Sequence, residues 1–291
     1  MDDSGTAQPP TGGNGRLALG GEQDQLAWSL RSDPGGVRDH NEDFGGTFLP
    51  EAGPTTGTQG PLFVVADGMG GHAAGEVASR VAVEAALATW QEQEGQPAQP
   101  ALRSALRAAN TAVFDTAIEQ RTHGMGTTIV AATLTGREVV TAHVGDSRAY
   151  LVHGDRCVQL TTDHSRVAEM LRMKLITPEQ AAVHPARSML TRSLGNELSV
   201  QVDFNTYPVN RGDVLMLCSD GLWDLVSRTE LVDVVRSNQG ASPRQAADQL
   251  LAAALERGAP DNVTTLVVRV EGNAPFPAAS GRRSLFGRRR P

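Results

Sequence analysis

Residues 62–79 read LFVVADGMGGHAAGEVAS, and this stretch decides how the rest of the chain is interpreted. Leu62 to Ala66 is a continuous apolar run of strand length, and the sequence from Ala73 onward has the spacing of an amphipathic helix. Asp67 and three glycines therefore fall on the turn between a strand and a helix. Closely spaced glycines allow tight backbone and the close approach of another group, as a metal or phosphate site requires.

The same turn partly fits a nucleotide-binding loop. Residues 68–73 (GMGGHA) match the loose dinucleotide fingerprint GxGxxA. That fingerprint also expects a second parallel strand ending in an acidic residue about 20 positions further on, whereas residues 77–90 continue as helix. The absence of this pattern counts against a nucleotide site. A second alternative is that Asp67 is a simple turn residue, which would be sufficient if it were the only acidic residue in such a position.

Acidic residues recur in four other segments, and several of them lie next to an apolar, strand-like run. The segments are Arg38 to Asp43 (RDHNED), Gly145 to Arg148 (GDSR), Ser219 to Asp224 (SDGLWD), and Asp261 with Asn262. Carboxylates at the ends of core strands can converge on one edge of a sheet. A cluster of oxygen ligands of this kind suits a hard divalent cation such as Mg²⁺ or Mn²⁺.

The order of these segments resembles a known family. RDHNED, ADGMGGHAAGE, GMGTT, HVGDSRAY, SDGLWD and APDNVT follow one another between about Leu26 and Val270. This series is similar to that of the metal-dependent Ser/Thr protein phosphatases of type 2C, the PPM family, in its bacterial form. Six motifs in order are far more specific than any one of them.

Composition limits the other classes of protein that need to be considered. The chain has 291 residues, enough for one sizeable domain or two small ones, and 26 Lys and Arg against 33 Asp and Glu give a net charge of −7. An acidic chain does not resemble a general nucleic-acid binder.

No apolar run reaches transmembrane length and the first residues lack a signal-peptide pattern, so we expect no membrane span. Cys157 and Cys218 lie in apolar runs, which favours buried free thiols and a cytoplasmic location.

We expect one phosphatase domain over residues 26–271. Residues 1–25 are rich in Gly, Pro, Asp and Ser and are expected to form a disordered leader. Residues 272–291 are expected to form a disordered basic tail, whose arginines are explained as a solvated charge run. A monomer is the default oligomeric state.

The predicted secondary structure alternates between blocks of strands and helices. Helices are expected at residues 73–91, 100–119 and 242–258, and strands at 26–31, 62–66, 127–134, 138–144, 148–152, 156–160, 200–207, 213–219 and 263–270. A polar loop at 55–60 is expected to be a hairpin tip. These blocks predict an α+β fold in which two antiparallel sheets pack face to face between helices, and the resemblance implies the same α/β/β/α sandwich.

Residues 161–195 interrupt the strands with polar, helical sequence. Thr177, Pro178 and Gln180 have the pattern of a helix cap, a first-turn proline and a capping-box partner. By resemblance, this segment is a small helical flap inserted beside the active site, where it would bias the choice of substrate.

The resemblance implies a ligand set for two or three Mn²⁺ or Mg²⁺ ions. Asp43, Asp67 and the carbonyl of Gly68 would hold the first and bridging positions, and Asp220 and Asp261 would complete the shell of the second ion. Asp146 resembles the ligand of a weaker third ion, although GDSR would also serve as a structural hairpin turn.

The implied reaction is hydrolysis of phosphoserine or phosphothreonine in proteins. Two divalent ions about 3.5–4 Å apart produce a bridging hydroxide that attacks phosphorus in line, so no protein nucleophile is required. Arg38 would grip the phosphate through its guanidinium fork, and a structural salt bridge to one of the carboxylates is the alternative. The general acid stays open: eukaryotic members resemble Asp-Gly-His at this turn, whereas this chain has Met69 there and His72 three residues later. His72 would either supply the proton or point to solvent.

The expected partners are phosphorylated proteins, together with a Ser/Thr kinase whose signalling in bacteria this enzyme would reverse. A catalytically inactive phosphoprotein-binding regulator on the same fold is the competing function. The presence of all four core aspartates and Arg38 counts against it. The remaining histidines, His143 and His164 among them, show no metal-ligand spacing and are expected to be surface or core residues. Thr127 and Thr128 are explained by strand packing.

Overall fold

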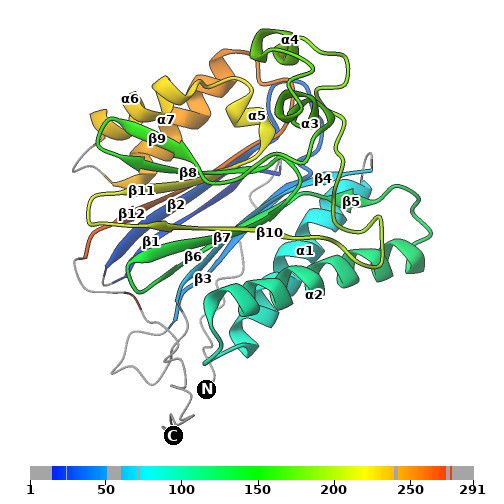
Figure 1. The fold of residues 1–291 in the computed structure, drawn as a ribbon, viewed down its shortest axis with the longest axis horizontal. Helices are drawn as coiled ribbons and strands as arrows, with labels where there is room; N and C mark the ends of the chain where they lie inside the picture. Colours follow the sequence, from blue (N-terminus) through cyan, green and yellow to red (C-terminus); the bar gives the residue numbers. More distant parts are fainter. Residues whose placement is uncertain are drawn as a thin grey trace, which may run out of the picture.

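Two antiparallel β-sheets lie face to face at the centre of the protein (Figure 1). The computed structural model describes residues 15–23, 25–50, 60–70, 73–238, 242–272 and 276. The first sheet contains, in spatial order, β1 (Leu17–Gln23), β2 (Leu26–Asp33), β12 (Val263–Val270), β11 (Val214–Cys218), β8 (Arg148–His153) and β9 (Arg156–Gln159). The second contains β10 (Asp203–Pro208), β7 (Glu138–Val144), β6 (Ile129–Thr135), β4 (Leu62–Met69) and β3 (Asp43–Phe48), and β5 (Gly126–Thr127) pairs with the end of β4.

Helices cover the outer face of each sheet (Figure 1). The pair α1 (Ala73–Glu92) and α2 (Ala98–Glu119) packs on the second sheet, whereas α5 (Asp220–Trp223), α6 (Arg228–Ser237) and α7 (Pro243–Glu256) pack on the first. The predicted α/β/β/α sandwich is therefore confirmed. Within the described part of the chain, none of the helices combines the length and hydropathy that crossing a bilayer requires.

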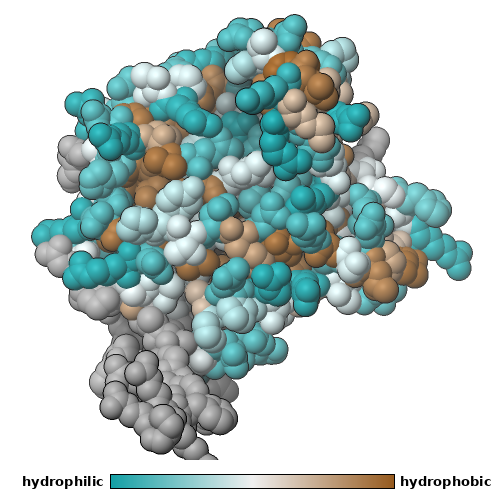
Figure 2. Space-filling model, in the orientation of Figure 1, coloured by the Kyte–Doolittle hydropathy of each residue, from teal (hydrophilic) through white to brown (hydrophobic). Residues whose placement is uncertain are grey.

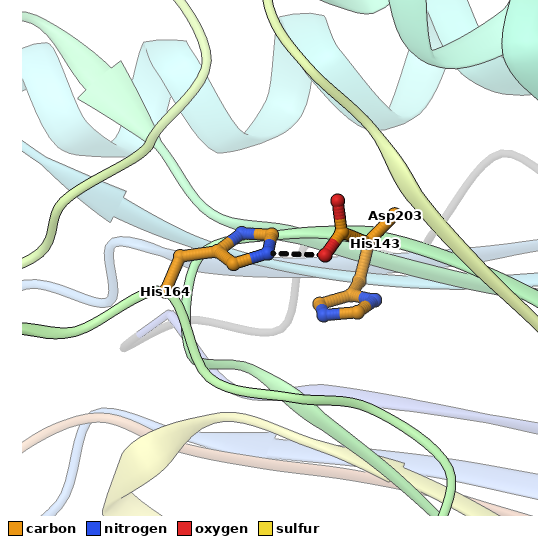
Figure 3. Close-up of side chains that lie close together, drawn as sticks. All are labelled: His143, His164 and Asp203. Carbon is orange, nitrogen blue, oxygen red and sulfur yellow. Dashed lines mark ion pairs between the residues drawn. The ribbon is translucent and has the colours of Figure 1, made fainter. Parts of the chain in front are cut away.

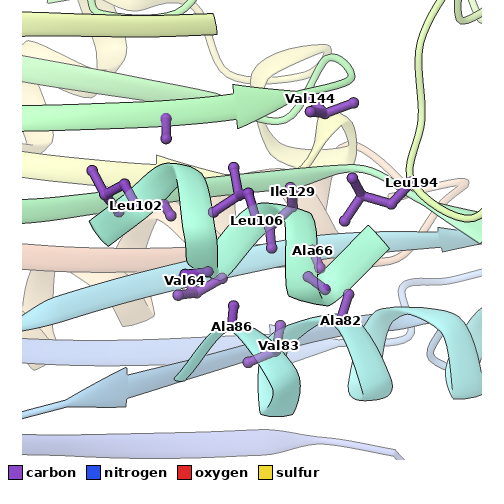
Figure 4. Packing of buried hydrophobic residues seen from close by; sticks show 14 of the residues in the cluster. Val64, Ala66, Ala82, Val83, Ala86, Leu102, Leu106, Ile129, Val144 and Leu194 are labelled. Atoms are coloured by element: carbon purple, nitrogen blue, oxygen red, sulfur yellow. The ribbon is translucent and has the colours of Figure 1, made fainter. Parts of the chain in front are cut away.

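The central strand β4 shows why the apolar run at Leu62 to Ala66 is continuous. Phe63 and Val65 point into the core between the two sheets, whereas Val64 and Ala66 point toward α1 and α2. Figure 4 shows the second contact, in which Val64 lies beside small residues of α1. Because both faces of β4 are covered, the usual alternation of polar and apolar residues is absent from it.

The flap at residues 161–195 contains α3 (Arg166–Arg172) and α4 (Pro178–Ala182). The predicted capping box is present, because Gln180 N–H donates to Thr177 Oγ1 (3.3 Å) and Thr177 N–H donates to Gln180 Oε1 (2.9 Å). Figure 2 shows apolar side chains gathered over α3 and α4, where Met173, Leu175 and Val183 are exposed. The flap is thus a small unit with little core of its own.

Two segments outside the expected domain bounds of residues 26–271 pair with the sheets. Residues 17–23 of the expected leader form β1, which pairs with β2 along its whole length, from Leu17 with Ser32 to Gln23 with Leu26. The glycines in LALGGEQ weaken the local strand signal, and pairing with the neighbouring strand supplies the stability instead. In the expected tail, Phe276 is buried and forms a bridge with Gly136.

Other expectations differ in smaller ways. The predicted strand at 127–134 is interrupted at Thr128, between β5 and β6, and the strand expected at 200–207 begins at Asp203. α6 is not among the predicted helices, although Ser227 and Glu230 form its capping box. The loop expected at 55–60 lies outside the described residues except for Gly60.

Replacing Leu30 by alanine is expected to lower the free energy of unfolding by about 3 kcal/mol, because truncation leaves a cavity between the sheets. Leu30 is 0% exposed and lies in the inter-sheet core. The same change at Leu175, which is 66% exposed, is the control and should cost no more than about 0.5 kcal/mol. Urea denaturation followed by circular dichroism measures both, and equal losses at the two positions would contradict the assigned core.

Candidate active site

A cleft of about 790 Å³ opens where the carboxyl end of β4 meets the flap. Arg38, Asp67, Asp146, Asp220 and Asp261 lie along one part of its lining. The residues that follow the flap helices form another part, including Leu190, Arg192, Asn196 and Gln201. Six sequence segments that are far apart in the chain therefore share one cavity.

Asp43 and Asp67 are brought together by strand pairing. They are direct partners in the register of β3 and β4. Ser219 Oγ donates to Asp43 Oδ2 (2.7 Å) and itself accepts from Thr264 N–H (3.0 Å). The backbone of Asp67 is held from β5, because Thr127 Oγ1 and Thr128 N–H both donate to its carbonyl at 2.8 Å.

Gly68 follows Asp67 at a point where only glycine fits. Its N–H donates to the carbonyl of Glu42 (3.0 Å). A Cβ atom at Gly68 would lie 2.0 Å from the Gly75 carbonyl oxygen and 2.6 Å from that of Glu42. Gly68, one of the glycines predicted to allow close approach, therefore does so between β4, α1 and the segment before β3.

Asp220 and Asp261 come from adjacent segments that Asn262 holds together. Asp220 is the first residue of α5, and the next residue, Gly221, packs so closely that a Cβ there would lie 2.1 Å from the Asn262 carbonyl oxygen. The Asn262 side chain accepts from Glu42 N–H (2.8 Å) and donates to the carbonyls of Pro34 (3.0 Å) and His40 (2.9 Å). One amide group thus ties the segment before β3 to the segment before β12.

The turn Gly145–Ser147 carries Asp146 into the same cleft. Gly145 has φ +103°, and a Cβ there would lie 2.6 Å from the Thr128 side chain. Trp223 Nε1 donates to the Asp146 carbonyl (3.0 Å), and Ser147 Oγ lies 2.7 Å from Thr128 Oγ1 in a hydrogen bond. The segment is therefore a structural turn that also presents the Asp146 carboxylate to the cleft.

The carboxyl groups form an electrostatically strained cluster. Burial is the main cause that raises the pKa of Asp43 to about 7, of Asp220 to about 6 and of Asp146 to about 8. The pKa of Asp67 is raised well above its ordinary value by burial and then by the neighbouring carboxylates Asp43, Asp220, Asp146 and Asp261. Like charges this close require a positive partner.

The donor atoms of the cluster fit divalent cations. Among the described residues, Asp43 Oδ1 and Asp220 Oδ1 are buried side-chain oxygens with no hydrogen-bond partner. Buried carboxylate oxygens without a donor are costly, and they are the ligands that Mg²⁺ and Mn²⁺ prefer. The residues present therefore satisfy the chemistry expected of a metal centre.

Arg38 lies at the rim of the cleft and forms an ion pair. Its Nη2 lies 2.8 Å from Asp261 Oδ2, and the hydrogen bond to Asp261 raises the pKa of Arg38. Both side chains remain about half exposed, at 51% and 41%. The salt bridge considered as the alternative is thus present, and the guanidinium keeps an open side toward the cleft. His72, the other predicted catalytic residue, lies outside the described residues.

Several residues that support the site have no role assigned from the sequence. Ser219, Asn262 and Trp223 lie inside the recognised motifs, but their partners are 45 to 228 positions away along the chain, as with Ser219 and Thr264 or Asn262 and Pro34. Arg148 lies 3.4 Å above the Trp223 ring and pairs with Asp163 (2.6 Å). The motifs marked these positions, and only the folded chain shows which contact each one makes.

A second cluster of titratable residues lies behind the flap (Figure 3). His143 on β7 is opposite Asp203 on β10, and His164 stacks on His143 with ring centroids 4.8 Å apart and planes inclined by 13°. Burial lowers the pKa of both histidines, to about 4 for His164. Because ring nitrogens bind metals in the plane of the ring, two stacked, nearly parallel rings do not direct their lone pairs at one ion. The cluster is therefore structural, and both histidines are buried as core residues.

The sequence model of the family described as Protein phosphatase 2C matches residues 53–256. This chain belongs to the protein phosphatase 2C family. It is 41% identical over 244 residues to the Serine/threonine phosphatase stp of Listeria welshimeri, covering 82% of this chain and 94% of the relative. Protein phosphatases of this family are metal-dependent hydrolases, and the chain is one of them.

Solved structures agree with this assignment. The Mycobacterium tuberculosis serine/threonine phosphatase PstP/Ppp superimposes with a TM-score of 0.75 at 36% identity, covering 86% of this chain and 100% of that one. The catalytic domain of PstP in complex with two manganese ions superimposes with a TM-score of 0.70 at 35% identity, covering 85% and 99%. The predicted family and fold are therefore confirmed.

Without metal ions, the protein is expected to be more stable at about pH 5 than at about pH 8. The raised pKa values of Asp43, Asp146 and Asp220 mean that the folded state retains protons that the unfolded state has released above its pKa of about 4. This stabilisation is complete below the unfolded pKa and is lost as the pH rises through about 6 to 8.

Urea unfolding in EDTA across this pH range measures the effect. Asp146→Asn should flatten the profile because it removes one buried ionisation, whereas the exposed Asp155→Asn is the matched control and should leave it unchanged. A metal-free stability that rises with pH in this window would contradict the assigned burial of the carboxylates.

Proposed function

We propose that this chain hydrolyses phosphoserine and phosphothreonine in bacterial proteins, with divalent ions held by the carboxylate cluster. The observation that carries the proposal is the mutually repelling set of aspartates, with two unpartnered buried oxygens, at a cleft that Asp67, Asp146 and Asp220 line and that is large enough for a phosphorylated side chain. The residues assigned to the ions are Asp43, Asp67, the Gly68 carbonyl, Asp220 and Asp261, with Asp146 as ligand of a third ion.

Mn²⁺ or Mg²⁺ is the proposed cofactor, because the donors are oxygen atoms alone. When bound, such ions supply an acidified water molecule for attack on phosphorus and neutralise charge on the phosphoryl oxygens. The chain's own contribution is to fix the ligands. Asp43 is oriented by Ser219, Asp67 by the threonines of β5 and its neighbour, and Asp146 by the contacts of its turn.

Arg38 is proposed to bind the phosphate. Its guanidinium has five N–H donors in a planar fork, and the Asp261 contact uses one Nη atom, so the fork can also meet two phosphate oxygens. The contact with Asp261 would then hold the fork in place at the rim. For the leaving oxygen, His72 remains the proposed general acid on sequence grounds.

The proposed substrates are proteins phosphorylated by a Ser/Thr kinase, which reach the cleft past the flap. Residues 188–201 line the cleft and are proposed to contact the substrate chain on either side of the phosphorylated residue. Cys157 and Cys218 are both free, which supports the proposed cytoplasmic location. We also propose a monomer whose phosphatase domain begins at β1, ahead of the boundary expected from the sequence.

Asp220→Asn is expected to lower the rate of phosphate release from a phosphothreonine peptide by at least about 100-fold, because it removes a charged ligand from the site. The wild type should release phosphate with Mn²⁺ and lose this activity in EDTA. Asp155→Asn, an exposed aspartate away from the cleft, is the matched control and should behave as wild type. No release from the wild type with any divalent ion would favour the inactive, phosphoprotein-binding regulator instead.

Arg38→Ala is expected to raise KM for the phosphopeptide about tenfold or more, because a charge-assisted pair to the phosphate is lost. Arg38→Lys should recover only part of this loss, since a lysine presents a point charge instead of a fork. Arg244→Ala, on the exposed face of α7, is the control for removing one positive charge. An unchanged KM in Arg38→Ala would contradict phosphate binding by Arg38, and the ion pair with Asp261 would then be its only role among those considered.

A further inference from the structure

The turn Gly145–Ser147 is held at each of its three residues by a different element. Ser147 bonds to Thr128, between β5 and β6, and the Asp146 carbonyl accepts from Trp223 at the end of α5. Gly145 is held by His164, which lies just before α3. Of these three supports, Trp223 comes from the helix that carries Asp220, Thr128 also holds the Asp67 carbonyl through its N–H, and His164 comes from the flap.

His164 engages both polar backbone groups of Gly145. Gly145 N–H donates to His164 Nδ1 (3.1 Å), and His164 N–H donates to the Gly145 carbonyl (3.0 Å). Because Nδ1 accepts a hydrogen bond from the Gly145 N–H group, the ring proton of the neutral imidazole must lie on Nε2. The side chain of His164 is 5% exposed, so water does not compete for these contacts.

The other side of the same ring faces the base of the flap. His164 Nε2 lies 3.2 Å from Asp203 Oδ2, and Arg192 Nη1 lies 2.8 Å from Asp203 Oδ1. The backbone closes the base as well, because Thr191 N–H donates to the His164 carbonyl (2.8 Å) and Ser165 forms a bridge with Leu190. We call this paired segment, residues 164–166 with 189–192, the flap neck.

A single imidazole therefore has two separate tasks. Its Nδ1 edge reaches the turn that carries Asp146, and its Nε2 edge reaches Asp203 and the flap neck. The stacked His143 below it limits the tilt of the ring, so the two contacts are made together. A shift of the flap neck would move Gly145, and with it the residue that immediately follows.

We propose that His164 is a positioning residue that couples the flap neck to Asp146 and so sets the affinity of the ion held there. The inference rests on the proposed metal role of Asp146. His164 touches neither substrate nor metal in this scheme, and it acts through the peptide of Gly145. Second-sphere contacts of this kind typically change metal affinity by about 10- to 100-fold when they are removed.

Two amide substitutions separate the tasks of the two ring edges. Asn carries an amide oxygen at the place of Nδ1, so His164→Asn keeps an acceptor for Gly145 N–H and loses the contact with Asp203. Gln carries its amide one bond further out, near the place of Nε2, so His164→Gln keeps the Asp203 side and loses the acceptor for Gly145. The two variants differ by one methylene group and in the ring edge whose contact survives.

The test is the rise in melting temperature with increasing Mn²⁺, each variant being compared with its own value in EDTA, together with KM and kcat for a phosphothreonine peptide. His164→Gln should need about tenfold more Mn²⁺ for the half-maximal rise in melting temperature, whereas His164→Asn should stay close to wild type. His164→Asn should instead raise KM, because the flap neck has lost its contact. In an Asp146→Asn background, His164→Gln should shift the Mn²⁺ response no further.

Two outcomes would overturn the coupling through His164, and a third would overturn the metal site itself. In the first, His164→Asn and His164→Gln require the same Mn²⁺ concentration for the half-maximal rise in melting temperature. That result, with or without a difference from the wild type, would show that His164 is an ordinary packing residue. A further loss in the Asp146→Asn background would show that the effect does not pass through Asp146. If the wild type showed no Mn²⁺-dependent rise in melting temperature, the metal site itself would be wrong, and the coupling would fall with it.

Discussion

The repulsion among buried carboxylates is the constraint on which the rest of the structure depends. Asp43, Asp67, Asp146 and Asp220 all have raised pKa values because each is removed from water beside the others. A chain that placed them this way on a weak scaffold would relax and separate them. The two packed sheets, with apolar layers between them and beneath the helices, supply the rigidity that holds the carboxylates together.

Backbone geometry, more than side-chain reach, sets where the carboxylates lie. Asp43 and Asp67 are register partners on neighbouring strands, so their separation follows from the spacing of the sheet. Asp220 is fixed by the start of α5 and by the close packing of Gly221 on Asn262. Short aspartate side chains at these positions have few rotatable bonds, so the proposed ligand positions, which the backbone defines, would need little further ordering on binding an ion.

How much the sequence predicts depends on whether a signal is local. Continuous apolar runs such as Leu62 to Ala66, and capping patterns such as that at Thr177, predict β4 and α4 well because neighbouring residues carry the information. β1 is missed because its glycines conceal a strand that depends on pairing with β2. The candidate aspartates were recognised from ordered motifs, whereas the roles of Ser219, Asn262 and His164 depend on contacts between distant segments, which no local pattern encodes.

The flap illustrates how a fixed site and an adaptable surface can share one segment. Within the described chain, α3 has no buried residue and α4 has one, Ala181, so the body of the flap has few apolar contacts to lose when it changes shape. Its neck, in contrast, is closed by backbone hydrogen bonds and by the buried pair of His164 with Asp203. Local stability therefore falls sharply from the neck to the tip. Because the turn Gly145–Ser147 is attached at the stable end, the outer flap can change shape while the carboxylates keep their positions.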